Sequence, residues 1–253
     1  IPTNGGCFRP VSLHLPEGTL VNPVEPAPVN SRTATLKRIA GSIVGALKGA
    51  LPGHIPADSA GELLVLSLGG KSLDGKPYVV GEFNAGGSGG GPRKDGVDVI
   101  ETDGSNCMNM PVEALELEAP VRVHRMGLRT DSGGVGEFRG GLGCVREIEF
   151  LADDIALTHR GERHRHAARG SQGGGAGAKA FSKIVRRDGS EEMVNSKLFT
   201  VVHAGERLIV ETAGGGGYGK PNKRNRQTIR DDVSNRKVSQ QCANAEYGLD
   251  DVN

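Results

Sequence analysis

The stretch Asn84-Ala85-Gly86-Gly87-Ser88-Gly89-Gly90-Gly91 is followed by Asp95-Gly96 and is echoed by glycine-dense runs at 170–177 and 212–219. Glycine has no Cβ, so runs of this density mark places where the backbone turns tightly or approaches another group closely. None of the three runs is a dinucleotide or P-loop signature. Those signatures need a strand before and a helix after, and the P-loop also needs a lysine beside Ser or Thr. The runs therefore do not predict phosphate cradles.

Composition indicates a chain that packs against something else. Of 253 residues, 36% are hydrophobic and 4% aromatic, with no Trp and 40 glycines. These fractions are low for a self-sufficient domain of this size, which predicts that the core is completed against a partner. The formal charge of +1 argues against a general polyanion binder. The basic segment 220–226 lacks the interleaved aromatic residues that stack on bases, so we expect no nucleic acid partner.

Cysteine spacing and hydropathy predict the compartment. The four cysteines are widely spaced without a CxxC pair, which favours reduced thiols in a cytoplasmic protein. No apolar run approaches the roughly 18 residues of a membrane span, and no secretory leader pattern is present. We therefore expect a soluble chain without a membrane partner. The start at Ile1-Pro2, without Met, predicts a processed or fragmentary chain.

The first half is predicted to be mixed. Prolines punctuate residues 1–30, which predicts an extended segment that wraps a surface. A helix is expected from a cap at Asn30 or Ser31 to Pro52-Gly53, because apolar residues recur at helical spacing along one face. That apolar face is expected to pack, with Lys37, Arg38 and Lys48 on the solvent side. Short apolar runs between 63 and 80 predict a hairpin.

The second half is predicted to be rich in strands. Candidate strands are 121–128, 145–151, 155–158, 180–185, and the pair 198–203 with 207–211, which the loop 204–206 joins. Beyond Pro221 we expect a short helix and a polar arm. The fold class is α+β, with a mixed part at 1–120, a β-rich part at 121–221, and a C-terminal arm at 222–253.

Several motifs occur in one order along nearly the whole chain. They are 4–10, 26–32, 86–89 with 95–96, 106–113 with Glu116, 131–136 with 139–143, 170–177, 214–221, 232–235, and 247–248. In this order the chain resembles the C-terminal half of hydantoinase B/oxoprolinase proteins. From this resemblance we expect the glycine runs to be turns that shape an interface or a pocket wall. Candidate backbone loops are Gly86, Gly87, Gly133, Gly134, Gly215 and Gly216.

The resemblance implies a subunit or fragment of a heteromeric ATP-dependent enzyme that hydrolyses a cyclic amide such as a hydantoin, 5-oxoproline or lactam. It implies that ATP and Mg²⁺ bind a hydantoinase A-like partner subunit. A divalent metal is expected on an N-terminal hydantoinase B-like half, which would be a further partner, and not on this chain. Two alternatives stay open: a subunit of an acetone or acetophenone type ketone carboxylase, and a noncatalytic scaffold subunit.

Glu82 and Asp95 are the best candidate catalytic residues. Acidic side chains around a glycine loop supply a general base or oxygen ligands for Mg²⁺, although they are also common as turn formers. Asn106 and Glu113 are candidates for substrate contact or for a buried hydrogen-bond network.

Arginines provide the remaining candidates for substrate or interface contact. Arg9 and Arg32 suit bidentate pairing with a partner's carboxylate, and Arg139 lies in a possible anion nest. Arg163 belongs to a cluster in which His159, His164 and His166 alternate with arginines. For that cluster metal binding, anion contact and a solvated strand end stay open, although the arginines favour a carboxylate or phosphate over a divalent cation.

Overall fold

The computed structural model describes residues 4–30, 32–101 and 107–249, which divide into two units. The first unit, Ile1–Arg32, contains the 3-10 helix η1 (Gly5–Phe8), which the Asn4 side chain caps by accepting from the Gly6 amide. Residues 9–30 of this unit form no helix or strand, as their prolines predict. The second unit, Thr33–Asn253, contains the sheets and the later helices.

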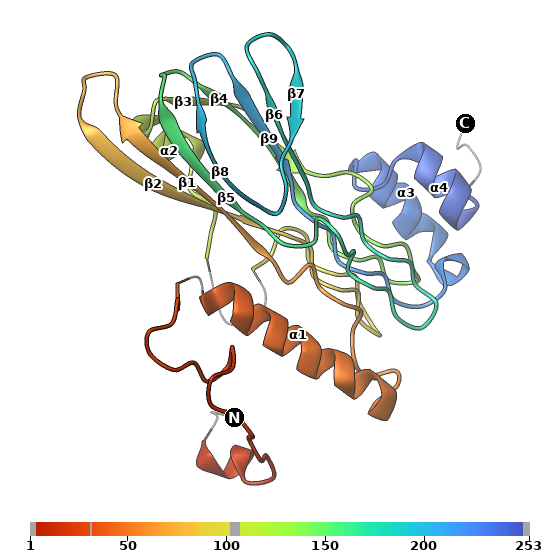
Figure 1. The fold of residues 1–253 in the computed structure, drawn as a ribbon. Coiled ribbons are helices and arrows are strands. Elements are labelled where there is room, and N and C mark those ends of the chain that lie inside the picture. The colour runs from red at the N-terminus through yellow and green to blue at the C-terminus, as the bar shows by residue number, and fades with distance from the viewer. Residues whose placement is uncertain (1–3, 31, 102–106, 250–253) are drawn as a thin grey trace. The chain divides into compact units, whose positions relative to one another are not determined.

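Two antiparallel sheets form the body of the second unit (Figure 1). The first sheet has the order β2-β1-β5-β8, with β1 (Leu63–Lys71), β2 (Pro77–Ala85), β5 (Ile155–Arg160) and β8 (Lys197–Val202). The second has the order β3-β4-β9-β6-β7, with β3 (Val121–Leu128), β4 (Cys144–Phe150), β9 (Arg207–Glu211), β6 (Phe181–Val185) and β7 (Glu191–Met193). A short helix, α2 (Val112–Glu118), precedes β3. The expected α+β class is confirmed.

Strand periodicity explains the core between the sheets. Alternate residues point to opposite faces of a strand, and β1 accordingly buries Leu64, Leu66 and Leu68 while the residues between them are only partly covered. On the second sheet, Leu208 and Val210 of β9 belong to the same buried cluster. Each fully buried side chain of this kind contributes about 2 kcal/mol relative to its exposed state.

The structure changes one of the predicted strand pairings. The hairpin of β1 and β2 is confirmed, closed by the turn in which the Ser72 amide donates to the Lys76 carbonyl. The loop 204–206 does join β8 to β9, but β8 pairs with β5 and β9 pairs with β4 and β6. The expected pairing of these two strands is therefore wrong. The loop carries the chain from one sheet to the other, which lets Val202 and Leu208 both enter the core.

The glycine runs pack largely backbone against backbone, and the predicted turn is found at 171–174, where the Gly174 amide donates to the Ser171 carbonyl. The Gly87 amide donates to the Ala213 carbonyl, the Gly215 amide to the Gly141 carbonyl, and the Gly134 amide to the Gly215 carbonyl, at 2.8–3.0 Å. A Cβ on Gly87 would overlap the Gly141 carbonyl. Glycine is needed here because neighbouring backbones leave no room for a side chain.

Helix α1 (Arg32–Ala50) forms where the sequence predicts, but the opposite face packs. The apolar residues Leu36, Ile39, Ile43, Leu47 and Leu51 are exposed. Lys37 is buried and pairs with Glu101 at 2.7 Å, while Lys48 pairs with Asp58. The expected apolar packing face is therefore wrong for this structure. Ion pairs, which the helical period does not encode, attach the basic side of the helix.

The C-terminal residues form two helices, α3 (Arg226–Ser234) and α4 (Gln240–Tyr247), after the short 3-10 helix η2 (Pro221–Lys223). Asn225 caps α3 and Ser239 caps α4 through side-chain oxygens that accept backbone amides. Ile229, Tyr247 and neighbouring apolar residues make a small core of their own. This part of the chain is thus more ordered than the predicted helix and arm.

Candidate functional site: a basic cavity beside α1

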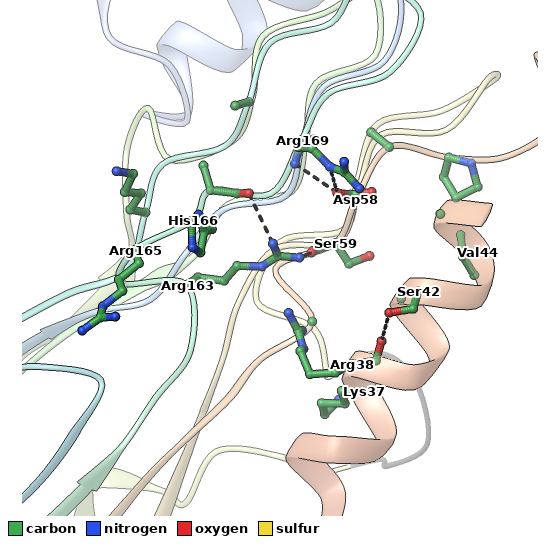
Figure 2. A pocket seen from close by; sticks show the side chains of 18 of the residues that line it. Lys37, Arg38, Ser42, Val44, Asp58, Ser59, Arg163, Arg165, His166 and Arg169 are labelled. Carbon is green, nitrogen blue, oxygen red and sulfur yellow. Dashed lines mark hydrogen bonds and ion pairs between the residues drawn. The ribbon is translucent and has the colours of Figure 1, made fainter. Parts of the chain in front are cut away.

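A cavity of about 1010 Å³ lies between α1 and the segment that follows β5 (Figure 2). Its described lining includes six basic side chains, one carboxylate and one histidine: Lys37, Arg38, Arg163, Arg165, Arg169, Lys179, Asp58 and His166. Gly41 and Gly45 of α1 also line the cavity. A Cβ on either residue would have nothing within 4 Å, so the absence of a side chain leaves open space beside the helix. The excess of positive charge makes this cavity the candidate functional site.

Two arginines converge on a single carbonyl in the cavity wall. Arg163 Nε donates to the Ala60 carbonyl at 2.8 Å, and Arg38 Nη2 donates to the same oxygen at 3.2 Å. Arg163 also donates to the carbonyls of Ser59 and Ala167. The neighbouring Gly61 has φ +53°, and a Cβ there would overlap the Arg38 guanidinium, so glycine is required for this arrangement.

Neutral carbonyl dipoles hold Arg163 in place without cancelling its charge. Burial lowers the pKa of Arg163, and the positive charge of Arg38 lowers it further, although Asp58 and Glu62 act in the opposite direction. Two guanidinium groups held together by one carbonyl repel each other in a partly desolvated place. An anion that enters the cavity would relieve that repulsion.

Asp58 is already engaged by cations on two sides. It pairs with Lys48 of α1, and Arg169 Nε lies 3.0 Å from its other oxygen. Burial raises the pKa of Asp58, but its bonds to Lys48 and Arg169 more than offset this and hold the pKa below its usual range. The carboxylate is therefore ionised and compensated. Lys37 is also compensated, by Glu101. Arg38, Arg163, Arg165 and Lys179 are the cavity cations that an anionic ligand would meet.

The histidines of the predicted cluster are divided by burial. His159 is fully buried in β5, and its Nε2 lies 3.0 Å from Ser182 Oγ. Burial lowers the pKa of His159 to about 4, and the neighbouring His164 contributes to this effect. The two rings meet edge to face with centroids 5.5 Å apart. His159 is thus a neutral core residue and not part of a solvated strand end, whereas His166 lines the basic cavity.

Among residues 4–30, 32–101 and 107–249, no group of three or more His, Cys, Asp or Glu side chains is arranged to hold a metal ion. In the same residues, no helix is long and apolar enough to cross a membrane.

Glu82 lies inside the body of the sheets and away from the cavity lining. It is buried in β2 and pairs with the buried Arg146 of β4. Burial raises the pKa of Glu82, and the charge of Arg146 opposes that rise. Glu82 thus forms a buried ion pair inside the sheets, and its catalytic role stays a prediction.

Asp95 lies in a different place, within a network of charges around the glycine layer. It accepts from Arg224 through both oxygens at 2.7 Å and from the Arg139 amide at 2.8 Å. Arg139 itself is buried and reaches Asp98 at 3.1 Å and Asp232 at 3.6 Å. The two predicted catalytic carboxylates are therefore not brought together, and Asp95 is held by structural partners.

The other predicted site residues are spread over the chain. Arg9 and Arg32 are exposed, and Glu113 lies in the first turn of α2, where a negative charge suits the helix dipole. Asn106 lies outside the described residues. Gly86, Gly133 and Gly216 belong, with the glycines described above, to the packed backbone layer.

Sequence reasoning took the arginines at positions 160, 163, 165 and 169 to favour an anion, and Arg163, Arg165 and Arg169 do line one cavity. It missed Lys37, Arg38 and Lys179. The sequence does contain basic residues on one side of α1. That side was predicted to be exposed to solvent, whereas in the structure Lys37 and Arg38 line the cavity.

The geometry defines a two-sheet α+β unit joined to a layer of packed glycine segments with a basic cavity at its side. The sequence model of the hydantoinase B/oxoprolinase family matches residues 1–221. The chain belongs to this family.

Three comparisons add detail. The caprolactamase subunit beta of Pseudomonas jessenii is 36% identical over 265 residues, covering 98% of this chain and 45% of the relative. The solved structure of an ATP-dependent caprolactamase from Pseudomonas jessenii matches 100% of this chain and 46% of that chain, with 31% identity and a TM-score of 0.84. A nucleotide-free acetone carboxylase has the same fold over 78% of this chain and 30% of that chain, at a TM-score of 0.66 and 20% identity. The chain thus spans less than half the length of the proteins that it matches.

Proposed function

We propose that this chain is one component of a heteromeric ATP-dependent enzyme that hydrolyses a cyclic amide. The observation that carries the proposal is the match of the entire chain to the ATP-dependent caprolactamase, with a TM-score of 0.84 and 31% identity. The hydantoinase B/oxoprolinase family match supports the same class of ring opening. The likeness to acetone carboxylase, at 20% identity, supports only a common fold, so hydrolysis is preferred over ketone carboxylation.

The proposed role of the basic cavity is to hold the anionic group of a ligand. Hydrolysis of an amide breaks the C–N bond and forms a carboxylate, and an ATP-dependent reaction handles phosphoryl groups as well. Arginine side chains bind both kinds of oxyanion well because their donors match carboxylate and phosphate geometry. The Arg38 and Arg163 pair is the centre of the site in this proposal.

The described lining of the cavity offers few oxygen ligands for a metal ion. Mg²⁺ requires oxygen ligands, but the described lining offers one carboxylate, Asp58, which already contacts Lys48 and Arg169. As the family resemblance implies, we propose that ATP and Mg²⁺ bind a hydantoinase A-like partner subunit. A divalent metal is assigned to a hydantoinase B-like N-terminal polypeptide, and no step is assigned to a metal on this chain. The compartment consistent with such an enzyme is the cytoplasm.

The reaction class is tested on the complex purified from the organism that produces this chain. ADP release is measured with hydantoin, 5-oxoproline and caprolactam, and separately with acetone or acetophenone plus bicarbonate. We expect ADP release coupled to ring opening of at least one cyclic amide. ATP turnover with ketone and bicarbonate alone would overturn the proposal in favour of a carboxylase.

The cavity is tested by calorimetric titration of the same complex with inorganic phosphate. Arg165→Gln removes an exposed cavity cation, and Arg230→Gln removes an exposed arginine of α3 as the matched control. We expect Arg165→Gln to weaken phosphate binding about tenfold, since it removes one charge-assisted contact. Equal phosphate binding by the two variants would contradict the role of the cavity.

A noncatalytic scaffold is separated from an enzyme component by Glu82→Gln and Asp95→Asn. Because both substitutions also weaken ion pairs of buried arginines, turnover is measured per folded and assembled complex. If either carboxyl group takes part in the reaction, this specific turnover falls about a hundredfold or more, the scale of a lost general acid or base. Full turnover by both assembled variants would favour the scaffold.

A further inference from the structure

The outer face of the first sheet carries several exposed apolar side chains, together with Ser67 and Thr158 in its middle row and Arg160 and Lys197 at one end. The register of β2, β1, β5 and β8 aligns three rows of outward residues across the four strands. The rows are Val79, Gly69, Ala156 and Val201; Gly81, Ser67, Thr158 and Phe199; and Phe83, Val65, Arg160 and Lys197. Val79 is 87% exposed and Phe199 is 71% exposed.

The outer face of the second sheet provides an internal comparison. There, Glu147 pairs with Arg207 at 2.5 Å and Glu149 with His124 at 2.7 Å. Lys183 of β6 pairs with Glu191 of β7 at 2.5 Å. A sheet face exposed to water carries polar residues of this kind, with apolar residues turned to the core. The two outer faces therefore differ in the surroundings to which they are adapted.

The shape of the first face also suits protein packing. Gly69 and Ala156 of the middle strands have little or no side chain. They lie between the larger side chains of the two edge strands, Val79 and Phe83 of β2 and Phe199 of β8. Exposed apolar side chains that gather on one face of a sheet mark an interaction site. The exposed stripe of α1, at Leu36, Ile39, Ile43, Leu47 and Leu51, is a second apolar surface of the same unit.

The lengths of the related proteins indicate what covers this face. In the solved caprolactamase the match to this chain accounts for 46% of one polypeptide, and in the caprolactamase subunit beta it accounts for 45%. More than half of each relative is therefore additional polypeptide joined to a unit with this fold. The outer face of the second sheet carries charged pairs that suit exposure to water. The outer face of the first sheet, with its exposed apolar side chains, is therefore the surface on which we expect that polypeptide to pack.

We infer that the outer face of the β2-β1-β5-β8 sheet packs against the hydantoinase B-like polypeptide that corresponds to the additional length of these relatives. This inference rests on the proposed heteromeric enzyme for the presence of that polypeptide. Phe199 and Val79 are strongly exposed apolar side chains of this face, and they lie on its two edge strands, β8 and β2. Whether the polypeptide is part of the same chain or a separate one does not change the surface.

Photocrosslinking in the native complex tests the inference. p-Benzoylphenylalanine replaces Phe199, and it replaces Met193 of β7 as the control, because Met193 is 59% exposed on the other sheet. We expect the probe at 199 to crosslink to hydantoinase B-like sequence outside the region that this chain matches, as identified by mass spectrometry. A crosslink from 199 to another copy of this chain, a crosslink to a different protein, or no crosslink would overturn the inference.

A second measurement uses Phe199→Asp and the matched Met193→Asp in the same complex. We expect Phe199→Asp to weaken attachment of that polypeptide about tenfold or more, measured by native mass spectrometry after limited proteolysis between the two parts, since burying an unpaired charge in an interface is costly. Equal attachment in both variants would overturn the inference. Amide hydrolysis is measured independently, so a complex that is inactive but crosslinks as expected contradicts the proposed function alone.

Discussion

Arg224 and Asp95 form a two-point ion pair in which Nη1 and Nη2 each lie 2.7 Å from one carboxylate oxygen, although 129 positions separate the two residues. Arg224 also reaches Asp232 of α3 at 2.6 Å. Burial lowers the pKa of Arg224, but its bonds to Asp95 and Asp232 raise the pKa above its usual range. The pair thus joins the glycine layer to the C-terminal helices.

We predict that Asp95→Asn lowers the free energy of unfolding by roughly 3 kcal/mol, because it leaves the buried Arg224 with reduced compensation. Denaturant unfolding measures the change. Asp154→Asn, at a side chain that is 87% exposed, serves as the control and should alter stability by less than about 0.5 kcal/mol. Equal effects of the two substitutions would contradict a stabilising role for this pair.

Glu82 and Arg146 lead to a prediction about charge compensation. Glu82→Gln leaves the Arg146 guanidinium buried without its carboxylate and should cost about 4 kcal/mol of unfolding free energy. Replacing both residues, as Glu82→Leu with Arg146→Met, removes the uncompensated charge and should recover most of that loss. A double variant that is less stable than Glu82→Gln would show that the pair has another structural role.

Glu62 predicts a specific pH dependence of stability. Burial raises the pKa of Glu62 from its ordinary value of 4.5 to about 7, although the backbone amides of Ala213 and Glu162 favour the charged form. Between pH 4.5 and 7 the folded chain therefore holds a proton that the unfolded chain has released. The stabilising contribution is present below pH 4.5 and is lost as the pH rises through about 7.

Urea unfolding at pH 5 and pH 8 checks this expectation. Wild-type protein should lose more stability over that interval than Glu62→Gln, which cannot titrate at this position. Identical losses in the two proteins would show that the carboxyl group of Glu62 has an ordinary pKa.

Gly87 and Gly45 test the origin of the glycine requirement. Gly87→Ala places a methyl group against the Gly141 carbonyl and should destabilise the fold by about 3 kcal/mol, the upper range for overpacking. Gly45→Ala lies inside α1 with nothing within 4 Å of the added Cβ and should stabilise by about 0.5–1 kcal/mol. Thermal unfolding of both variants gives the comparison. A neutral Gly87→Ala would mean that the glycine segments can separate.

Local sequence patterns are sufficient to predict most of the strands of this fold. Alternation of apolar residues predicted most of the strands, including β3 at its observed bounds and the β1-β2 hairpin. These features depend on residues near one another in the chain. Spacing could not show that β8 and β9 enter different sheets, because each strand has an inward apolar residue that suits either partner.

For helix α1, the sequence pattern predicted the position of the helix but not the face that packs. Its apolar stripe predicted the packing face, but Glu101 and Asp58 attach the basic side through Lys37 and Lys48. The partners lie 64 and 10 positions away, and no helical period contains them. The apolar stripe is left exposed in this unit.

The sequence by itself determined the family and the α+β class, because an ordered set of motifs and alternation along strands are local properties of the chain. Tertiary structure decided that the glycine runs pack largely backbone against backbone, that Asp95 pairs with Arg224, and that Arg38 and Arg163 converge on the Ala60 carbonyl. These relationships join residues 22 to 129 positions apart. Charge pairing and backbone packing depend on distance in space, and only the folded chain sets those distances.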